Sequence, residues 1–273
     1  MPERTVSILG CGWLGLPLAQ LFVKNNYRVK GSTTTLAKLA LLKQENILPY
    51  HLVFQPQLQG NGAKEFLEAD ILFLNIPFKR DLPAEFYRHQ IQSVISYLEG
   101  SPIKDVIFTS STAVYPETNG IVDETTPINK NNERARVLSE IEQMFLLHRK
   151  FRSVVIRFVG LFGPGRAIGS FFNKIPKEKL YNAPTNLIYL QDCLGIVDQV
   201  IKQKVSGDIL NACSDDHPLR KDLYAKFLSP ELMRTATFID PKENSYKIVS
   251  NEKLKRVLQY KFFYPNPLMA PQK

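Results

Sequence analysis

The sequence predicts an α/β fold built on a doubly wound parallel sheet, and three observations indicate it. Apolar segments of strand length alternate with segments of helical period along residues 5–158. A G-x-G-x-x-G spacing joins the first of these strands to the first helix. Residues 71–75, ILFLN, form a nearly continuous apolar run, which is typical of a parallel strand covered on both faces.

The stretch TVSILGCGWLGLPLAQLF, residues 5–22, combines a strand, a glycine turn and a helix. The first glycine allows a tight turn, the second leaves room for a pyrophosphate, and the third lets helix and strand pack closely. The helix N-terminus adds N–H groups and a partial positive charge. We therefore predict a dinucleotide site, the alternative being a glycine-rich turn in an unrelated α/β domain. The cofactor-contacting residues predicted in this turn are Gly10, Gly12, Trp13, Leu14 and Gly15.

The remaining elements of the sheet follow in order. Further strands are predicted at residues 27–32, 50–54, 71–75, 105–109 and 153–158, and helices at 36–45, 64–69, 83–98 and 132–149. Right-handed crossovers place the carboxyl ends of these strands along one edge, where ligands bind. We expect Asn75, Ser110 and Ser111 at this edge, with Asn75 and Ser110 contacting the cofactor.

The pattern changes beyond residue 160, where glycine and proline break the chain into short pieces. Strands are predicted at 186–190 and 208–211, with a helix at 193–202 between them. We predict a Rossmann domain at residues 1–160, to which 186–210 return. A small C-terminal α/β substrate cap is predicted from residues 161–185 and 211–273.

The composition argues against several classes of protein. Fractions of 44% hydrophobic and 22% charged residues are ordinary for a soluble globular chain. No apolar run approaches the ~18 residues of a membrane span, and the first residues lack the pattern of a signal peptide. Three separated cysteines argue against a disulfide framework, and neither they nor the four histidines have metal-ligand spacing. We expect a cytoplasmic protein without a metal or membrane partner.

The formal net charge of +9 raises the question of a nucleic-acid partner. Lys and Arg are scattered along the chain, and no nucleic-acid motif accompanies them. We therefore disfavour nucleic acid. A basic surface also suits anionic small molecules, and we expect a small-molecule substrate.

Five motifs follow one another in an order that is typical of one family. They are FTSSTAVY at 108–115, similar to S-S-x-x-V-Y-G with Pro116 for the last glycine; DETTP at 123–127, similar to D-E-x-x-P; residues 157–166, similar to R-x-x-x-x-Y-G-P-G-R with Phe162 for Tyr; IYLQD at 188–192, similar to I-H-V-x-D; and DILN at 208–211, similar to V-Y-N. Together they resemble the extended short-chain dehydrogenases/reductases, which are the nucleotide-sugar epimerases and dehydratases.

The resemblance implies chemistry that rests on Ser or Thr, Tyr and Lys. Ser111 occupies the position of the family's Ser, four residues before the Tyr of V-Y. The Y-x-x-x-K pair falls on Arg134 and Leu138, and residues 131–149 contain neither Tyr nor Lys. The family's usual acid/base pair is therefore missing.

Two more departures narrow the chemistry that the resemblance implies. Thr112 and Ala113 stand where sugar 4,6-dehydratases carry an Asp-Glu pair, which argues against that reaction. Gly160 stands where many members have an Asn that contacts the diphosphate of a sugar nucleotide. A nucleotide-sugar substrate is accordingly less favoured.

The end of the second strand indicates which dinucleotide binds. NAD-binding proteins place an Asp or Glu there, ~20 residues past the glycine turn, to bond the ribose hydroxyls. The segment KGSTTT, residues 30–35, has no carboxylate. Ser32, Thr33, Thr34 and Lys38 would accept a 2′-phosphate, so we predict NADP, with NAD as the alternative. Ser32 and Thr33 would equally suit the N-terminal cap of the next helix.

Three residues have both a chemical and a structural interpretation. Tyr115 is close in sequence to Ser111 and could transfer a proton, although the resemblance implies a Tyr that is usually structural. Arg134 could bind an anionic substrate or stabilise negative charge, or it is a solvated side chain at a helix start. Arg166 could bind a substrate anion or fix its own loop.

These observations predict an NADP-binding protein of the epimerase/dehydratase type. It would be an oxidoreductase or epimerase that acts by hydride transfer on a small polar or sugar-like substrate. Ser111 would bond the reacting oxygen, and the proton donor would be non-standard. The missing Tyr and Lys also suit an alternative, a dinucleotide-binding sensor or regulator without turnover.

Overall fold

The computed structural model describes residues 4–79, 81–173 and 179–271, and the chain forms two compact units. Unit 1 comprises Met1–Ser110, Lys130–Ile156 and Lys204–Ile209. Unit 2 comprises Ser111–Asn129, Arg157–Gln203 and Leu210–Lys273. Because the chain passes between the units several times, each unit is assembled from segments that lie far apart in the sequence.

The main sheet contains seven strands within the described part of the chain, in the order β13-β9-β7-β6-β1-β2-β3. These strands are β1 (Thr5–Leu9), β2 (Arg28–Thr33), β3 (Leu48–His51), β6 (Ile71–Leu74), β7 (Asp105–Ser111), β9 (Arg152–Phe158) and β13 (Asp208–Ala212). β1 lies between β2 and β6 and pairs with both in parallel. The predicted fold class, a doubly wound parallel sheet of the Rossmann type, is confirmed.

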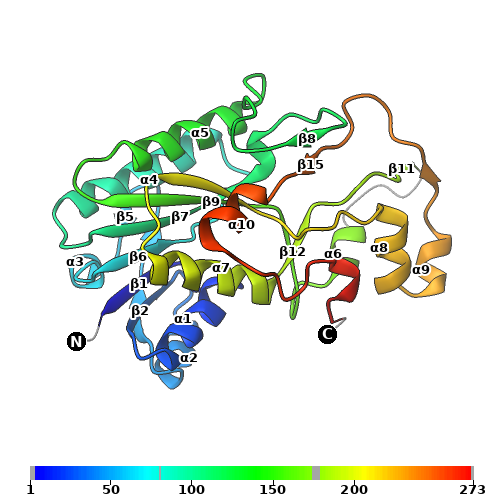
Figure 1. Ribbon diagram of the computed structural model, residues 1–273. Helices are drawn as coiled ribbons and strands as arrows, with labels where there is room; N and C mark the ends of the chain where they lie inside the picture. The colour runs from blue at the N-terminus through cyan, green and yellow to red at the C-terminus, as the bar shows by residue number, and fades with distance from the viewer. Residues whose placement is uncertain (1–3, 80, 174–178, 272–273) are drawn as a thin grey trace. The chain divides into compact units, whose positions relative to one another are not determined.

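Helices cover both faces of this sheet. In unit 1 they are α1 (Gly15–Lys24), α2 (Lys38–Gln44), α3 (Ala63–Phe66), α4 (Ala84–Glu99) and α5 (Glu133–Leu146). Figure 1 shows α4 and α5 together on one side of the strands, with α1 and α2 on the other. Val6, Ile8, Leu18 and Phe22 are fully buried where α1 packs on the sheet. Burial of side chains of this size contributes roughly 1.5–3 kcal/mol each.

The third strand differs from its prediction. It was expected at residues 50–54, but β3 covers Leu48–His51 and pairs with β2 from Lys30 to Thr33. Pro49 lies inside this strand, although proline donates no backbone hydrogen bond. β3 is the last strand in the sheet order, and an edge strand tolerates a proline. The next residues form a separate antiparallel hairpin, β4 (Val53–Phe54) with β5 (Leu58–Gln59).

The helix predicted at 132–149 begins as expected but ends early. Asn132 caps α5, since its side chain accepts a hydrogen bond from the Ala135 N–H at 3.1 Å. The helix ends at Leu146. His148 then stacks on Phe151 with ring centroids 4.1 Å apart, and its Nδ1 accepts from the Lys150 N–H. These local contacts turn the chain toward β9.

Unit 2 consists of short elements. They are η1 (Thr112–Val114), β8 (Ile121–Val122), β10 (Gly160–Phe162), α6 (Ile168–Phe172), β11 (Leu180–Tyr181), β12 (Leu187–Tyr189), α7 (Leu190–Gln203), α8 (Arg220–Phe227), α9 (Pro230–Arg234), β14 (Phe238–Ile239), β15 (Ile248–Val249), α10 (Glu252–Leu258) and η2 (Pro267–Met269). The strand predicted at 186–190 is β12, which pairs with β10. The predicted domain boundaries remain a prediction.

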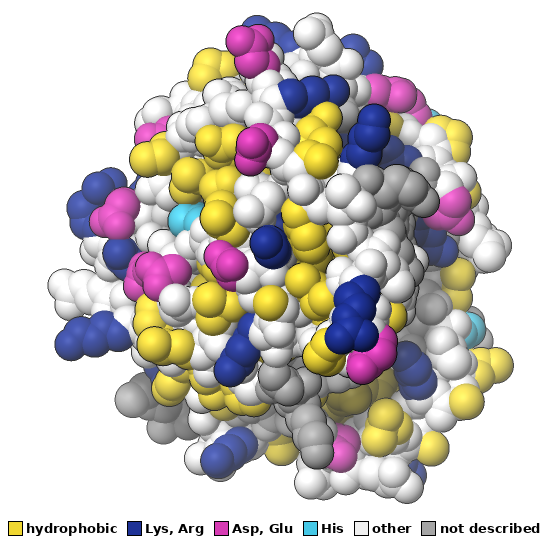
Figure 2. All heavy atoms as spheres, turned by 90° about the vertical axis from the view of Figure 1, so that its right-hand side faces the viewer, with side chains coloured by type: hydrophobic (Ala, Val, Ile, Leu, Met, Phe, Trp, Pro, Cys, Tyr) yellow, Lys and Arg dark blue, Asp and Glu magenta, His cyan; other side chains and the backbone are white. Residues whose placement is uncertain are grey.

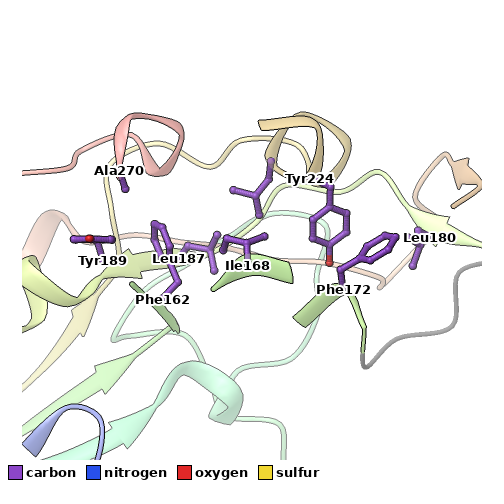
Figure 3. Packing of buried hydrophobic residues seen from close by; sticks show 9 residues of the cluster. Phe162, Ile168, Phe172, Leu180, Leu187, Tyr189, Tyr224 and Ala270 are labelled. Carbon is purple, nitrogen blue, oxygen red and sulfur yellow. The ribbon is translucent and has the colours of Figure 1, made fainter. Parts of the chain in front are cut away.

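Aromatic side chains form the core of unit 2 (Figure 3). The rings of Phe172 and Tyr224 meet edge to face with centroids 5.0 Å apart, and those of Phe162 and Tyr189 at 5.3 Å. Ile168 lies among them, also buried. Such aromatic pairs each add about 0.5–1.5 kcal/mol beyond the burial of their area. The short helices and strands of unit 2 therefore have an apolar core of their own.

Charged side chains are dispersed over the surface that carries α8 and α9. Figure 2 shows Lys and Arg spread across this face, with Asp and Glu between them. None of the helices in the described residues is long and apolar enough to cross a membrane.

Asp192 anchors the C-terminal segment of unit 2. Its side chain is completely buried on α7, and its carboxylate accepts hydrogen bonds from Phe263 N at 2.7 Å, Tyr264 N at 3.0 Å and the Tyr260 hydroxyl at 3.1 Å. A charged acceptor with three donors compensates for the loss of solvent. The aspartate of the IYLQD motif thus has a structural role.

Replacement of Asp192 by Ala leaves these donors buried without an acceptor. We expect Asp192→Ala to lower the free energy of unfolding by about 2–3 kcal/mol. Asp222→Ala, at an exposed position on α8, serves as the control and should change it by less than about 0.5 kcal/mol. Denaturant unfolding measures both, and equal effects of the two substitutions would contradict the anchoring role.

Candidate functional site

The glycine turn between β1 and α1 is held by the end of β2. Gly10 N donates to the Ser32 hydroxyl at 3.0 Å, and Cys11 N donates to the Ser32 carbonyl at 2.8 Å. Ser32 is buried. Two hydrogen bonds to a single residue of the neighbouring strand therefore fix the backbone of the turn.

The three glycines of the turn have different surroundings. Gly10 has a φ of +108°, and a Cβ there would collide with the Asn75 carbonyl oxygen. A Cβ on Gly15 would collide with the Gly10 carbonyl oxygen. A Cβ on Gly12 would meet no atom within 4 Å. The fold itself requires Gly10 and Gly15, whereas Gly12 faces open space that a ligand group can fill.

The start of α1 suits an anion at this open space. The first N–H groups of a helix lack partners within the helix and carry a partial positive charge. The first turn of α1 contains no acidic residue, and its N-cap, Leu14, provides no side-chain cap. Leu14 is buried in the core, whereas Trp13 is half-buried beside Gly12. Of the predicted contacts, Gly12 and Trp13 are the more open to a ligand.

Asn75 connects three strand ends in unit 1. It follows β6, its Nδ2 donates to the Gly10 carbonyl at 3.3 Å, and its Oδ1 accepts from the Thr109 hydroxyl at 3.3 Å. Sequence reasoning did not single out Thr109. Ser110 is buried, and its hydroxyl donates to the buried carboxylate of Glu142 on α5. Within unit 1, the carboxyl ends of β1, β6 and β7 thus meet as predicted.

The polar residues at the end of β2 and beyond it divide into two groups. Ser32 and Thr33 are buried, and the Thr33 hydroxyl accepts from Thr35 N at 3.1 Å. Thr34 and Lys38 are exposed. The suggestion that Ser32 and Thr33 cap the next helix is wrong, because the N-cap of α2 is Ala37 and no side chain caps it.

Arg134 holds the segment between β6 and α4. Its guanidinium donates to the carbonyls of Lys79 and Leu82, each at 3.1 Å, and lies 4.9 Å from the centroid of the Phe78 ring. Leu138, one turn further along α5, is buried. At the two positions where the resemblance would place the Tyr and the Lys, the chain therefore has Arg134, which fixes a loop, and Leu138, which packs in the core.

Ser111 and Tyr115 both lie in unit 2. The Ser111 hydroxyl accepts from Ala113 N at 3.1 Å and caps η1, and this side chain is half-exposed. The Tyr115 hydroxyl is buried, accepts from Arg157 at 2.7 Å and donates to Asn211 at 2.9 Å. Burial is the main cause that raises the pKa of Tyr115. These contacts favour the structural interpretation of Tyr115.

Unit 2 contains a pocket of about 280 Å³ that sequence reasoning did not identify. Its walls combine apolar and polar side chains: Glu117, Ile168, Phe171, Pro184, Thr185, Asn186, Leu187, Arg220, Leu223, Tyr224, Ser245, Tyr246 and Lys247. Lys247 is buried and pairs with Glu117 at 3.0 Å, and Arg220 donates to the Tyr181 carbonyl at 3.0 Å. Lys247 and Glu117 are far apart in sequence, so no local pattern could have linked them.

Arg166 lies beside this pocket of unit 2. Two backbone hydrogen bonds between Gly163 and Arg166 close the tight turn that precedes α6. The Arg166 guanidinium lies 5.7 Å from the centroid of the Phe171 ring, and Phe171 lines the pocket. Both interpretations of Arg166, the loop and a substrate anion, are compatible with this position.

The cysteines do not form a reactive centre. All three are buried and unbridged, and burial raises the pKa of Cys11 to about 12. A thiol of this pKa stays protonated near neutral pH and is a poor nucleophile. No group of three or more His, Cys, Asp or Glu in the described ranges could hold a metal ion.

Several solved structures have a fold similar to that of this chain. A short-chain dehydrogenase/reductase superfamily protein from Agrobacterium tumefaciens with bound NAD matches with a TM-score of 0.72 and 13% identity, over 94% of this chain and 92% of that chain. UDP-glucose 4-epimerase from Stenotrophomonas maltophila, with bound NAD and formylated UDP-arabinopyranose, matches with a TM-score of 0.74 and 12% identity, over 95% and 93%. The chain shares the fold of these two proteins.

A relative that is similar in sequence identifies the family of this chain. Protein YeeZ of Escherichia coli strain K12 is 33% identical over 276 residues, covering 98% of this chain and 99% of its own length. The chain belongs to the family of Protein YeeZ. No protein-family model matches it.

The glycine turn allows a test of which positions the fold itself requires. Gly15→Ala forces a Cβ onto a backbone oxygen, and we expect it to cost about 1–3 kcal/mol of stability. Gly12→Ala should change stability by less than about 0.5 kcal/mol, because its Cβ enters open space. Thermal unfolding of the two variants beside the parent measures this. An equal loss in both would contradict the open space at Gly12.

Proposed function

We propose that the glycine turn binds the pyrophosphate of a nicotinamide dinucleotide. The observation that carries this proposal is the open space at Gly12, beside the N-terminus of α1, in a turn whose other two glycines are explained by packing. A diphosphate at this place would accept hydrogen bonds from backbone N–H groups where the turn enters α1, the Gly15 N–H among them, and would be stabilised by the helix dipole. Gly12 and Trp13 would contact it, and Asn75 and Ser32 would fix the turn.

We propose NADP as the preferred dinucleotide. Residues 30–38 contain no carboxylate that would bond ribose hydroxyls or repel a 2′-phosphate. Thr34 and Lys38 are exposed beyond β2 and are the groups proposed to bind this phosphate. Ser32 and Thr33 would support phosphate binding indirectly, because their hydroxyls accept hydrogen bonds from the backbone N–H groups of Gly10 and Thr35.

We propose that the substrate is a small polar or sugar-like molecule. The pocket of unit 2 supports this, because an apolar wall carries a few fixed polar groups, among them Asn186, Arg220 and Lys247. Thr185 and Tyr246 add hydroxyl groups that suit a polyol. Arg166 would reach an anionic substituent.

The proposed reaction is an oxidoreductase or epimerase reaction. A bound nicotinamide supplies or accepts a hydride. In this chain the half-exposed Ser111 hydroxyl would hydrogen-bond the reacting oxygen, as the family resemblance implies. The proton donor must be non-standard, because Arg134 does not release a proton and Leu138 cannot.

A sensor or regulator without turnover is the second candidate, and one observation favours it. Arg134 is bonded to two loop carbonyls, and Leu138 is buried. These are the two helix positions where the resemblance would place the Tyr and the Lys. Neither side chain can therefore exchange a proton with a substrate. Such a protein would bind the dinucleotide and respond to its redox state.

The dinucleotide proposal predicts separable effects of two substitutions. Gly12→Val should weaken the binding of both NADP and NAD at least about tenfold, because its branched side chain fills the phosphate space. Lys38→Gln should weaken NADP about five- to tenfold and leave NAD unchanged. Lys43→Gln on the same helix, also exposed, is the matched control. Calorimetric titration measures all three, and an equal loss of NADP and NAD in Lys38→Gln would contradict the 2′-phosphate assignment.

Turnover distinguishes the two candidate functions. With NADPH and a panel of small carbonyl compounds, an oxidoreductase should consume cofactor, and Ser111→Ala should reduce the rate constant about 10²- to 10³-fold. Ser111→Thr retains a hydroxyl and should restore part of the rate, whereas a purely structural role of the η1 cap would leave the rate of a folded Ser111→Ala variant unchanged. Unequal affinity for NADP and NADPH without any consumption would favour the sensor.

A further inference from the structure

A second pocket lies at the opposite edge of the sheet from the glycine turn. It has a volume of about 460 Å³ and lies within unit 1, where Lys104 precedes β7 and Arg152 begins β9. In a parallel sheet these are amino ends of strands, whereas the dinucleotide turn follows the carboxyl end of β1. We call this cavity the amino-end pocket. No part of the proposed function uses it.

The walls of the amino-end pocket carry an excess of positive charge. Lys104, Arg149, Lys150 and Arg152 line it, and all four are exposed. Arg152 is neutralised by Asp105, which it contacts at 2.7 Å and which also lies 3.6 Å from Arg4. His148 also lines the pocket, with Nε2 3.6 Å from a carboxylate oxygen of Glu99. Three cationic side chains thus exceed the charge that the nearby carboxylates balance.

Ser153 adds an independent observation at the same place. It lines the amino-end pocket and is 3% exposed, and its hydroxyl has no hydrogen-bond partner among the described residues. A buried hydroxyl without a partner costs roughly 1–3 kcal/mol. Its backbone carbonyl is already used by the N–H of Gly207. The hydroxyl is enclosed in the pocket wall, so an acceptor atom from outside the chain would complete its bonding after a small movement of that wall.

We propose that the amino-end pocket binds a small soluble anion that carries two or more phosphate groups. Lys104, Arg149 and Lys150 would neutralise the phosphates, and Ser153 would donate a hydrogen bond. A single carboxylate or phosphate would leave part of the cationic excess unmatched and most of the volume empty. A polyphosphate matches both the charge and the size of the pocket.

The basic residues after α5 also suit a simpler role, since cations near a helix C-terminus stabilise the helix dipole. That role concerns stability alone and predicts no ligand. Lys24 and Lys43 provide a matched control, because both are exposed cations in the last turn of a helix of unit 1. A double substitution at either pair removes the same charge beside helix C-termini.

The experiment is a calorimetric titration with inorganic tripolyphosphate at constant ionic strength. The parent protein, Lys24→Gln/Lys43→Gln and Gly12→Val should bind it with similar affinity. Arg149→Gln/Lys150→Gln should weaken binding at least about tenfold. Ser153→Ala should weaken it about threefold or more and at the same time raise the melting temperature of the free protein, because it removes an unpaired buried hydroxyl.

Several outcomes would overturn the proposal. Loss of binding in Gly12→Val with full binding in Arg149→Gln/Lys150→Gln would place the tripolyphosphate at the glycine turn, which would support the dinucleotide proposal alone. If the two double variants bound tripolyphosphate equally weakly, the loss would reflect the net charge of the protein and not a site in the amino-end pocket. Tighter binding of a single-stranded oligonucleotide than of tripolyphosphate would assign the surface to nucleic acid. Failure of NADP binding, in contrast, would leave the amino-end pocket untouched.

Discussion

The close approach of three backbone segments at the end of β1 is the constraint on which the site depends. The Asn75 carbonyl lies where a side chain of Gly10 would be, and the Gly10 carbonyl lies where a side chain of Gly15 would be. These contacts bring the start of α1 against the carboxyl ends of β1 and β6. Ser32 then fixes the turn from β2. Packing within the fold explains Gly10 and Gly15, whereas the space at Gly12 is open, and we propose that a ligand occupies it.

This constraint concerns the dinucleotide half of the proposed site and not its catalytic half. The half of the site that we propose to bind a dinucleotide lies in unit 1, with a glycine turn bonded to Ser32, a helix start without a side-chain cap and an exposed Lys38. The helix positions that carry proton transfer in similar enzymes hold Arg134 and Leu138, which here fix a loop and fill a core. This chain thus has the scaffold of the fold, with other residues at the two helix positions where the resemblance would place Tyr and Lys.

Much of the fold could be predicted from the sequence, because the strands of a doubly wound sheet are continuous apolar runs and its turns have specific glycine requirements. The glycine turn and Asn75 follow from these local rules. The edge strand β3 could not be placed correctly, since its tolerance of Pro49 depends on its position in the sheet. Ser32 is a turn-fixing residue only because β2 adjoins β1. The pocket of unit 2 and the amino-end pocket are formed by segments that lie far apart in the sequence, so no local sequence pattern predicts either pocket.

The most direct test of the central claim uses Trp13, the single tryptophan of the chain, which lies inside the glycine turn. Bound NADPH at this turn would quench its emission and accept its excitation energy, because the indole and the reduced nicotinamide would be within the same site. We predict saturable quenching of Trp13 emission by NADPH, reversed by excess NADP and absent in Gly12→Val. Emission that does not change at any NADPH concentration, in a folded protein, would contradict the account.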